Sequence, residues 1–159
     1  MKKVLFVCTG NTCRSIMAEG FFNSCVQKAE GSRLQFTASS AGISAFDGDC
    51  ASSNALKVLK DWNIDIGYHR SKRISSVEVE NAVVILTMTG EHKRALVKEF
   101  PSAISKTYTL KEYAYESKGV NNIRADICDP YGGSEEVYRR CAIEIKEAVD
   151  KLVERLTRM

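Results

Sequence analysis

The sequence lacks any apolar run long enough to span a bilayer. Its start, Met1-Lys2-Lys3, leads into apolar residues without the small-residue cleavage site of a signal peptide. Only two histidines occur, and no two of the six cysteines are spaced as C-x2-C, so a metal site is not expected. The net charge of +3 is too small to indicate nucleic acid as a partner. We therefore expect a cytoplasmic protein that binds neither nucleic acid nor membrane.

Internal repeats, low-complexity tracts and linker-like segments are absent as well. With 44% hydrophobic and 27% charged residues, the 159-residue chain has the composition of a globular protein with a sizeable core. The six cysteines are too scattered for a secreted disulfide framework, and Cys25 and Cys141 fall on apolar helix faces that predict core positions. We predict a single domain over residues 1–159 that acts as a monomer.

Short apolar runs alternate with helical patterns along the chain. The apolar runs predict buried strands at 4–8, 34–40 and 82–87 and a short fourth strand at 106–110. Helical spacing predicts helices over 15–29, 51–63, 90–100 and about 137–156, and a polar loop is expected at 117–122. This order predicts an α/β fold, a three-layer sandwich around a four-stranded parallel sheet. Ligands of such sheets bind beyond the carboxyl ends of the strands.

A polar loop from Cys8 to Ser15 joins the first strand to the first helix. Backbone N–H groups at a helix start lack intrahelical partners, and the helix dipole adds positive charge there. Gly10 and Asn11 tolerate a left-handed backbone, which turns successive N–H groups inward. Arg14 adds a planar fork that matches two phosphate oxygens. The loop is therefore predicted to bind a phosphoryl group at the end of the first strand.

Cys8 opens this loop, where the same positive field favours the nucleophilic thiolate over the thiol. The Ser15 hydroxyl can add a hydrogen bond to the sulfur. The alternative is a small buried hydrophobic residue at a strand end. The order of strand, Gly-Asn, and Arg-Ser at the helix start favours a nucleophile. Ser40 ends the second strand, where its hydroxyl either faces the loop or forms an ordinary turn.

Attack by Cys8 on a phosphoryl group expels a leaving group that needs a proton donor. Asp129 is the candidate, in a segment constrained by Pro130 and the Gly132-Gly133 pair, although the same residues also build ordinary turns. Tyr131 either forms an apolar wall for a flat substrate group or simply packs.

A basic run covers residues 68–73, and we consider a solvated face and a rim that attracts an anionic substrate. His69, within this run, is alternatively an internal residue that braces the loop. His92 lies on a charged helix and is expected at the surface.

Three motifs span nearly the whole chain: Cys8-Thr9-Gly10-Asn11-Thr12-Cys13-Arg14-Ser15 with Met17-Ala18-Glu19 after it, Ser40-Ala41-Gly42, and Asp129-Pro130-Tyr131. They resemble the low-molecular-weight protein tyrosine phosphatase family. The resemblance implies hydrolysis of phosphorylated protein substrates through a phosphocysteine intermediate, with inorganic phosphate as product and no metal or organic cofactor. It implies Cys8 as nucleophile and Asp129 as general acid and then base.

The resemblance also implies a phosphate cradle formed by the loop, with Tyr131 contacting the substrate; the cradle residues are Thr9, Gly10, Asn11, Thr12, Cys13 and Arg14. Asn11 would hold the loop conformation, Ser15 would lie beside the nucleophile, and Ser40 and His69 match supporting positions. Cys13 corresponds to a residue that can form a disulfide with Cys8 under oxidation.

Several residues depart from the family pattern. Ile16 stands where the family usually has proline, Thr89 where eukaryotic members have aspartate, and Gly132 where they have a second aromatic residue. With Thr12 in the loop, these departures resemble the bacterial branch that includes protein arginine phosphatases. A threonine at this position is associated there with phosphoarginine specificity, so phosphotyrosine and phosphoarginine are both candidate substrates.

Two other functions would use the same loop. A thioredoxin-coupled arsenate reductase shares the fold but needs further cysteines around residues 80–92, and the sequence has none there. A catalytically idle phosphoprotein-binding module would keep the cradle, but the presence of both Cys8 and Asp129 argues against it.

Overall fold

The computed structural model describes residues 1–29, 35–116 and 125–159. Its sheet is parallel, with strand order β2-β1-β3-β4; the strands are β1 Lys2–Cys8, β2 Phe36–Gly42, β3 Ala82–Thr87 and β4 Thr107–Thr109. The helices are α1 Arg14–Lys28, α2 Ser53–Lys60, α3 Ser76–Asn81, α4 Gly90–Glu99, α5 Leu110–Ala114 and α6 Glu135–Thr157, with a 3-10 segment, η1, at Pro101–Lys106.

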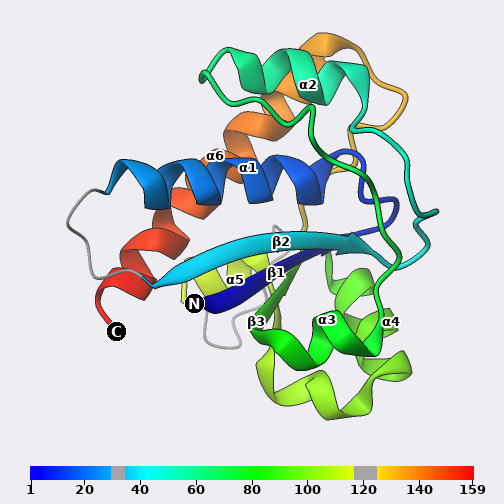
Figure 1. Ribbon diagram of the computed structural model, residues 1–159, viewed down its shortest axis with the longest axis vertical. Helices are drawn as coiled ribbons and strands as arrows, with labels where there is room; N and C mark the ends of the chain where they lie inside the picture. Colours follow the sequence, from blue (N-terminus) through cyan, green and yellow to red (C-terminus); the bar gives the residue numbers. More distant parts are fainter. Residues whose placement is uncertain (30–34, 117–124) are drawn as a thin grey trace.

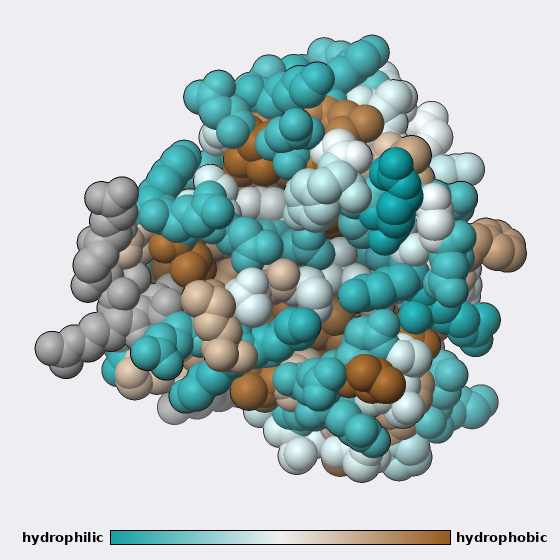
Figure 2. Space-filling view, viewed as in Figure 1, coloured by the Kyte–Doolittle hydropathy of each residue, from teal (hydrophilic) through white to brown (hydrophobic). Residues whose placement is uncertain are grey.

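Helices cover both faces of the sheet (Figure 1). The core on one face includes residues of α1, α2, α5 and α6, and the core on the other includes residues of α3, α4 and η1. The predicted three-layer α/β sandwich with four parallel strands is therefore confirmed. In Figure 2 hydrophilic side chains cover much of the visible face, with smaller apolar patches between them.

Strand β1 lies inside the sheet and is buried on both faces. Val4, Phe6 and Cys8 face the core that contains α1 and α6, whereas Leu5 and Val7 face the other core. Side chains alternate along a strand, so a strand covered on both faces needs a continuous apolar run. The same alternation directs the Cys8 side chain toward α1.

The loop after β1 opens where the strand order changes direction, because β2 and β3 lie on opposite sides of β1. Such a switch point is the usual ligand site of an open parallel sheet. Gly42, at the end of β2, pairs with Cys8. A Cβ atom at Gly42 would lie 2.5 Å from the carbonyl oxygen of Thr9. Glycine at this position therefore allows β2 to pack directly against the loop.

Some predicted boundaries are wrong. Strand β2 continues to Gly42, so Ser40 lies within the strand, opposite Phe6, and not at its end. Helix α2 is shorter than the predicted 51–63 and is followed by a turn in which Asn63 has a φ of 59°. Helices α3 and α5 were not predicted, because six and five residues are too few to show helical periodicity. Leu34, the predicted start of the second strand, and the loop predicted at 117–122 lie outside the described residues.

The prediction for Cys141 is confirmed, since this residue is buried, but the prediction for Cys25 is wrong. Cys25 is only partly buried because it lies in the second half of α1, where the helix leaves the core, and its thiol contacts Asp150 Oδ1 at 3.4 Å. Across residues 1–29, 35–116 and 125–159, no helix is both long and apolar enough to cross a membrane.

Candidate active site

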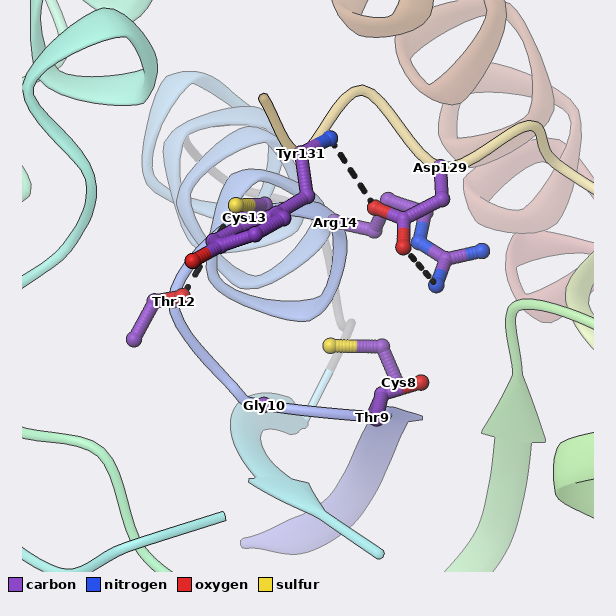
Figure 3. Close-up of a pocket in the computed structure, with 8 residues that line it drawn as sticks. All are labelled: Cys8, Thr9, Gly10, Thr12, Cys13, Arg14, Asp129 and Tyr131. Carbon is purple, nitrogen blue, oxygen red and sulfur yellow. Dashed lines mark hydrogen bonds and ion pairs between the residues drawn. The ribbon is translucent and has the colours of Figure 1, made fainter. Parts of the chain in front are cut away.

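A cavity of about 210 Å³ opens at the carboxyl end of β1 (Figure 3), and its lining residues are Cys8, Thr9, Gly10, Thr12, Cys13, Arg14, Asp129 and Tyr131. Six of them come from the loop between β1 and α1 and its junction with the helix, and two come from the segment before α6. The sequence predicted a catalytic or binding role for each. The other predicted site residues, Asn11, Ser15, Ser40 and His69, are buried and join the loop to the protein around it.

Four carbonyl oxygens of the loop accept hydrogen bonds from the surrounding protein. The pairs are Cys8 O with Ile43 N at 2.9 Å, Thr9 O with Ser44 N at 3.0 Å, Asn11 O with His69 Nε2 at 2.6 Å, and Thr12 O with Ser52 N at 2.9 Å. In a trans peptide the C=O and N–H bonds point in opposite directions. The outward carbonyls therefore turn the following N–H groups toward the cavity. The first turn of α1 carries no acidic side chain, so this edge suits an anion.

Asn11 is fully buried and has a φ of 58°, in the left-handed region. Its Nδ2 donates to Ser15 Oγ at 2.9 Å and to Ser40 Oγ at 3.0 Å, and its Oδ1 accepts from the backbone N–H of Lys72 at 2.9 Å. Gly10 was predicted to share the left-handed backbone, but within this fully described loop Asn11 alone has a positive φ. One left-handed residue is enough to shape the loop, because asparagine tolerates that backbone conformation and its side chain hydrogen-bonds to the neighbouring elements.

The Cys8 sulfur is buried in the cavity and lies 3.0 Å from Ser15 Oγ. Ser15 Oγ accepts a hydrogen bond from Asn11 Nδ2, which leaves the Ser15 hydroxyl proton free to point toward the sulfur. A hydroxyl proton directed at the sulfur suits a cysteine that acts as a nucleophile. Asn11 thus orients Ser15 as a donor to Cys8.

Arg14 is almost fully buried and contacts the segment that carries Asp129 at two points. Its Nη1 donates to the carbonyl oxygen of Ile127 at 2.8 Å, and its Nη2 lies 3.6 Å from Asp129 Oδ2. The backbone N–H of Ile127 donates to Met88 O, just beyond β3. Arg14 and the end of β3 therefore hold the Asp129 segment over the cavity.

Asp129 and Tyr131 form the open side of the cavity. The Asp129 side chain is 54% exposed, and its Oδ1 accepts from the backbone N–H of Tyr131 at 3.1 Å. Tyr131 is 78% exposed, so its ring lines the cavity and is not part of the core. A carboxyl group in this position can approach the leaving group of a substrate bound to the loop.

Cys13 also lines the cavity, and its sulfur lies 3.3 Å from the hydroxyl of Tyr138. Burial and the hydrogen bond with Cys13 raise the pKa of Tyr138 to about 12, so Tyr138 keeps its proton. Both Cys8 and Cys13 are free thiols in this structure. Their disulfide stays a prediction.

The buried carboxylate of Glu19 was not predicted as a site residue. Its Oε1 accepts from Ser40 Oγ at 2.9 Å, and its Oε2 accepts from the Tyr68 hydroxyl at 2.6 Å. Burial and this carboxylate raise the pKa of Tyr68. Because Ser40 in turn accepts from Asn11, Glu19 is linked to the loop through Ser40. A glutamate among the apolar residues that start α1 is the sequence signal for such a buried contact.

The two histidines both contact the loop. His69 is buried and its Nε2 donates to Asn11 O. Of the two alternatives for this residue, the structure therefore supports an internal residue that braces the loop. The prediction that His92 lies at the surface is wrong, because it is 9% exposed and its Nε2 lies 2.8 Å from Thr9 Oγ1. The charged residues around His92 suggested a solvent-exposed helix. The sequence feature that indicates burial is the spacing of four residues between His92 and Leu96, the other buried residue of α4, which places both on one helix face.

Within the described residues, no three His, Cys, Asp or Glu side chains are grouped so as to hold a metal ion.

Comparison with known proteins agrees with this geometry. The family model described as "Low molecular weight phosphotyrosine protein phosphatase" matches residues 3–159. The chain belongs to this family. It is therefore a hydrolase of the protein phosphatase class.

Individual members of this phosphatase family are similar over almost their full length. A protein-arginine-phosphatase of Geobacillus stearothermophilus is 39% identical over 97% of this chain and 95% of its own length. The crystal structure of a low molecular weight protein tyrosine phosphatase from T. tengcongensis has a TM-score of 0.87 and 42% identity, covering 98% of this chain and 99% of that one.

A third relative bears on mechanism. A mutant of the YwlE arginine phosphatase, with a phosphorylated active site serine, has a TM-score of 0.87 and 35% identity, covering 97% of this chain and 95% of that one. A phosphoryl group on a side chain of the active site fits a reaction through a phosphorylated enzyme. The arsenate reductase and idle-module alternatives are not favoured.

Proposed function

We propose that Cys8 is the nucleophile of this phosphatase, Arg14 its phosphate-binding side chain and Asp129 its general acid and base. The observation that supports this most is the convergence of these three side chains on one cavity from two distant parts of the chain. The Thr9–Arg14 loop would supply N–H donors to the phosphoryl oxygens. Preorganised donors of this kind stabilise the charge of a transferring phosphoryl group.

In the first step the Cys8 thiolate attacks phosphorus, and the bond from phosphorus to the leaving oxygen or nitrogen breaks. Asp129 gives its proton to the leaving atom as that bond breaks. Arg14 and the loop N–H groups hold the three equatorial oxygens, so the negative charge is neutralised where it is greatest. The product of this step is phosphocysteine at Cys8 and a dephosphorylated protein.

In the second step water attacks the phosphocysteine. The Asp129 carboxylate, which lost its proton in the first step, removes a proton from that water. The sulfur leaves as the thiolate, which the Ser15 hydroxyl stabilises by its hydrogen bond. Inorganic phosphate is released, and the protonated Asp129 and the Cys8 thiolate are restored.

We propose phosphoarginine as the preferred substrate residue. The observation that supports it is Thr12, whose side chain lies at the cavity with its hydroxyl 3.7 Å from the Cys13 sulfur. A polar β-branched side chain can position a water or a guanidinium group, whereas a larger aliphatic side chain would pack on a phenol ring. The similar Geobacillus protein is named a protein-arginine-phosphatase.

The test compares kcat/KM for a phosphoarginine peptide and a phosphotyrosine peptide of the same sequence. We expect the wild type to prefer phosphoarginine, and Thr12→Ile to shift the preference toward phosphotyrosine. Thr12→Val is the matched control, because it removes the hydroxyl at nearly constant size. A preference for phosphotyrosine that Thr12→Ile does not change would reject phosphoarginine.

We propose that residues 1–159 act as one catalytic domain, as a monomer in the cytoplasm. All six cysteines are free in the structure, and a thiol nucleophile works best in a reducing compartment. Sedimentation at assay concentration tests whether the protein is a monomer.

Turnover of p-nitrophenyl phosphate that is lost in Cys8→Ser would distinguish an enzyme from a binding module.

A further inference from the structure

His92 is a buried residue that none of the reaction steps above uses. It lies in the first turn of α4, and its backbone N–H donates to Thr89 Oγ1 at 3.1 Å, which fixes its backbone. Its side chain reaches the phosphate-binding loop, where Nε2 lies 2.8 Å from Thr9 Oγ1. Thr9 itself lines the cavity. A single hydrogen bond therefore connects the histidine to the lining of the cavity.

The imidazole of His92 is neutral at physiological pH. Burial, together with the positive charge of Arg14, lowers the pKa of His92 to about 4. A neutral imidazole has one N–H and one bare nitrogen, so the hydrogen bond to Thr9 has two possible directions. The direction depends on which ring nitrogen carries the proton.

The surroundings of the other ring nitrogen, Nδ1, indicate which direction the hydrogen bond between His92 and Thr9 takes. It is buried and has no hydrogen-bond partner among the described residues. A proton on Nδ1 would create a buried donor without an acceptor, and such orphaned N–H groups are rarer than acceptors left without a donor. A proton on Nε2 leaves only a lone pair unpaired. The Nε2–H form of His92 is thus favoured, and it donates to Thr9 Oγ1.

The direction of this bond determines what Thr9 offers to an anion. If Thr9 donated to His92, its oxygen would present only lone pairs to the cavity and would repel a phosphate oxygen. If His92 donates, the hydroxyl proton of Thr9 is free to point into the cavity. We propose that His92 is a positioning residue that makes the Thr9 hydroxyl a donor to the bound phosphoryl group. This inference rests on the proposed function only in taking a phosphoryl group as the ligand.

The tautomer can be observed without any turnover. Nitrogen-15 NMR of histidine-labelled protein, with inorganic phosphate added, distinguishes a protonated Nε2 from a protonated Nδ1. The chain has only two histidines, and the spectrum of His92→Gln identifies the signal of His92. We expect protonated Nε2 and bare Nδ1. Protonated Nδ1 at His92 overturns the proposal.

Binding of inorganic phosphate and kcat/KM for the phosphopeptides then measure the effect through Thr9. We expect His92→Leu to weaken both by about fivefold to tenfold, the value of one ordinary hydrogen bond. His92→Gln keeps an N–H donor near the position of Nε2 and should stay within about twofold of the wild type. In a Thr9→Val background, His92→Leu should have no further effect, because its partner is already gone.

Each outcome separates the proposals. The positioning role is overturned if His92→Leu lowers phosphate affinity and kcat/KM equally in the wild type and in Thr9→Val. It is also overturned if His92→Gln lowers them as much as His92→Leu does. Either result leaves His92 with a packing role. If His92→Leu does not fold, the tautomer and His92→Gln decide alone. Wild-type protein that neither binds phosphate nor hydrolyses phosphopeptides overturns the proposed function as well, whereas active wild type with unaltered His92→Leu overturns only this inference.

Discussion

Replacing Asn11 should cost both stability and phosphate binding. Asn11→Ala removes three side-chain hydrogen bonds, to Ser15, Ser40 and Lys72, each worth about 1 kcal/mol net. It also places alanine at a φ of 58°, which costs roughly a further 1 kcal/mol. We expect the free energy of unfolding to fall by about 4 kcal/mol, from these four contributions of about 1 kcal/mol each.

Two matched variants at position 11 separate these contributions. Asn11→Gly loses the same hydrogen bonds but accepts the left-handed backbone, so it should be more stable than Asn11→Ala by about 1 kcal/mol. Asn11→Asp keeps the acceptor for Lys72 but cannot donate to Ser15, so the Ser15 hydroxyl loses its orientation toward Cys8. Urea unfolding gives the stabilities, and phosphate titration gives the affinities. Asn11→Ala within about 1 kcal/mol of the wild type would refute the reasoning.

Three further predictions concern charge and proton transfer. The pKa of His92 falls from its ordinary 6.5 to about 4 on folding, so between these pH values the unfolded chain binds more protons than the folded one. The free energy of unfolding should therefore rise with pH over this range, by at most about 3 kcal/mol. Urea unfolding should show a flatter pH dependence in His92→Gln. Asp129→Asn should slow kcat for alkyl phosphates at least tenfold more than for p-nitrophenyl phosphate, and equal slowing would reject Asp129 as the acid. Phosphate titration should show that Cys8→Ser still binds the anion, whereas Arg14→Ala loses at least tenfold in affinity.

The sequence predicted the parts of the site that are local in the chain. The apolar run of β1, the polar loop and the start of α1 are continuous, so their order alone indicated a nucleophile beside an anion cradle. Asp129 was also predicted, because phosphoryl transfer needs an acid and Asp129 lies in a segment constrained by Pro130 and the Gly132-Gly133 pair. The predictions for the loop depend on backbone geometry that neighbouring residues largely determine.

The contacts between distant segments were harder to predict. Thr9 and His92 are 83 positions apart, and nothing local shows that α4 turns His92 toward the loop. Glu19 was given no role of its own, because the residues whose hydroxyl groups converge on it, Ser40 and Tyr68, lie 21 and 49 positions away in the chain. Helix α3 buries a single residue, Val79, so it leaves almost no apolar pattern. Tertiary packing, and not local preference, determines all three.

Arg14 contacts Ile127 and Asp129 through different nitrogens of one guanidinium group. In the proposed mechanism, the side chain that binds the phosphoryl group thus also sets the distance between Asp129 and the phosphorus before any substrate arrives. Lysine at this position would keep the charge but not the planar fork that fixes this separation. Arg14→Lys should therefore impair proton delivery to poor leaving groups more than it impairs anion binding, because the arginine both binds the anion and sets the position of the acid.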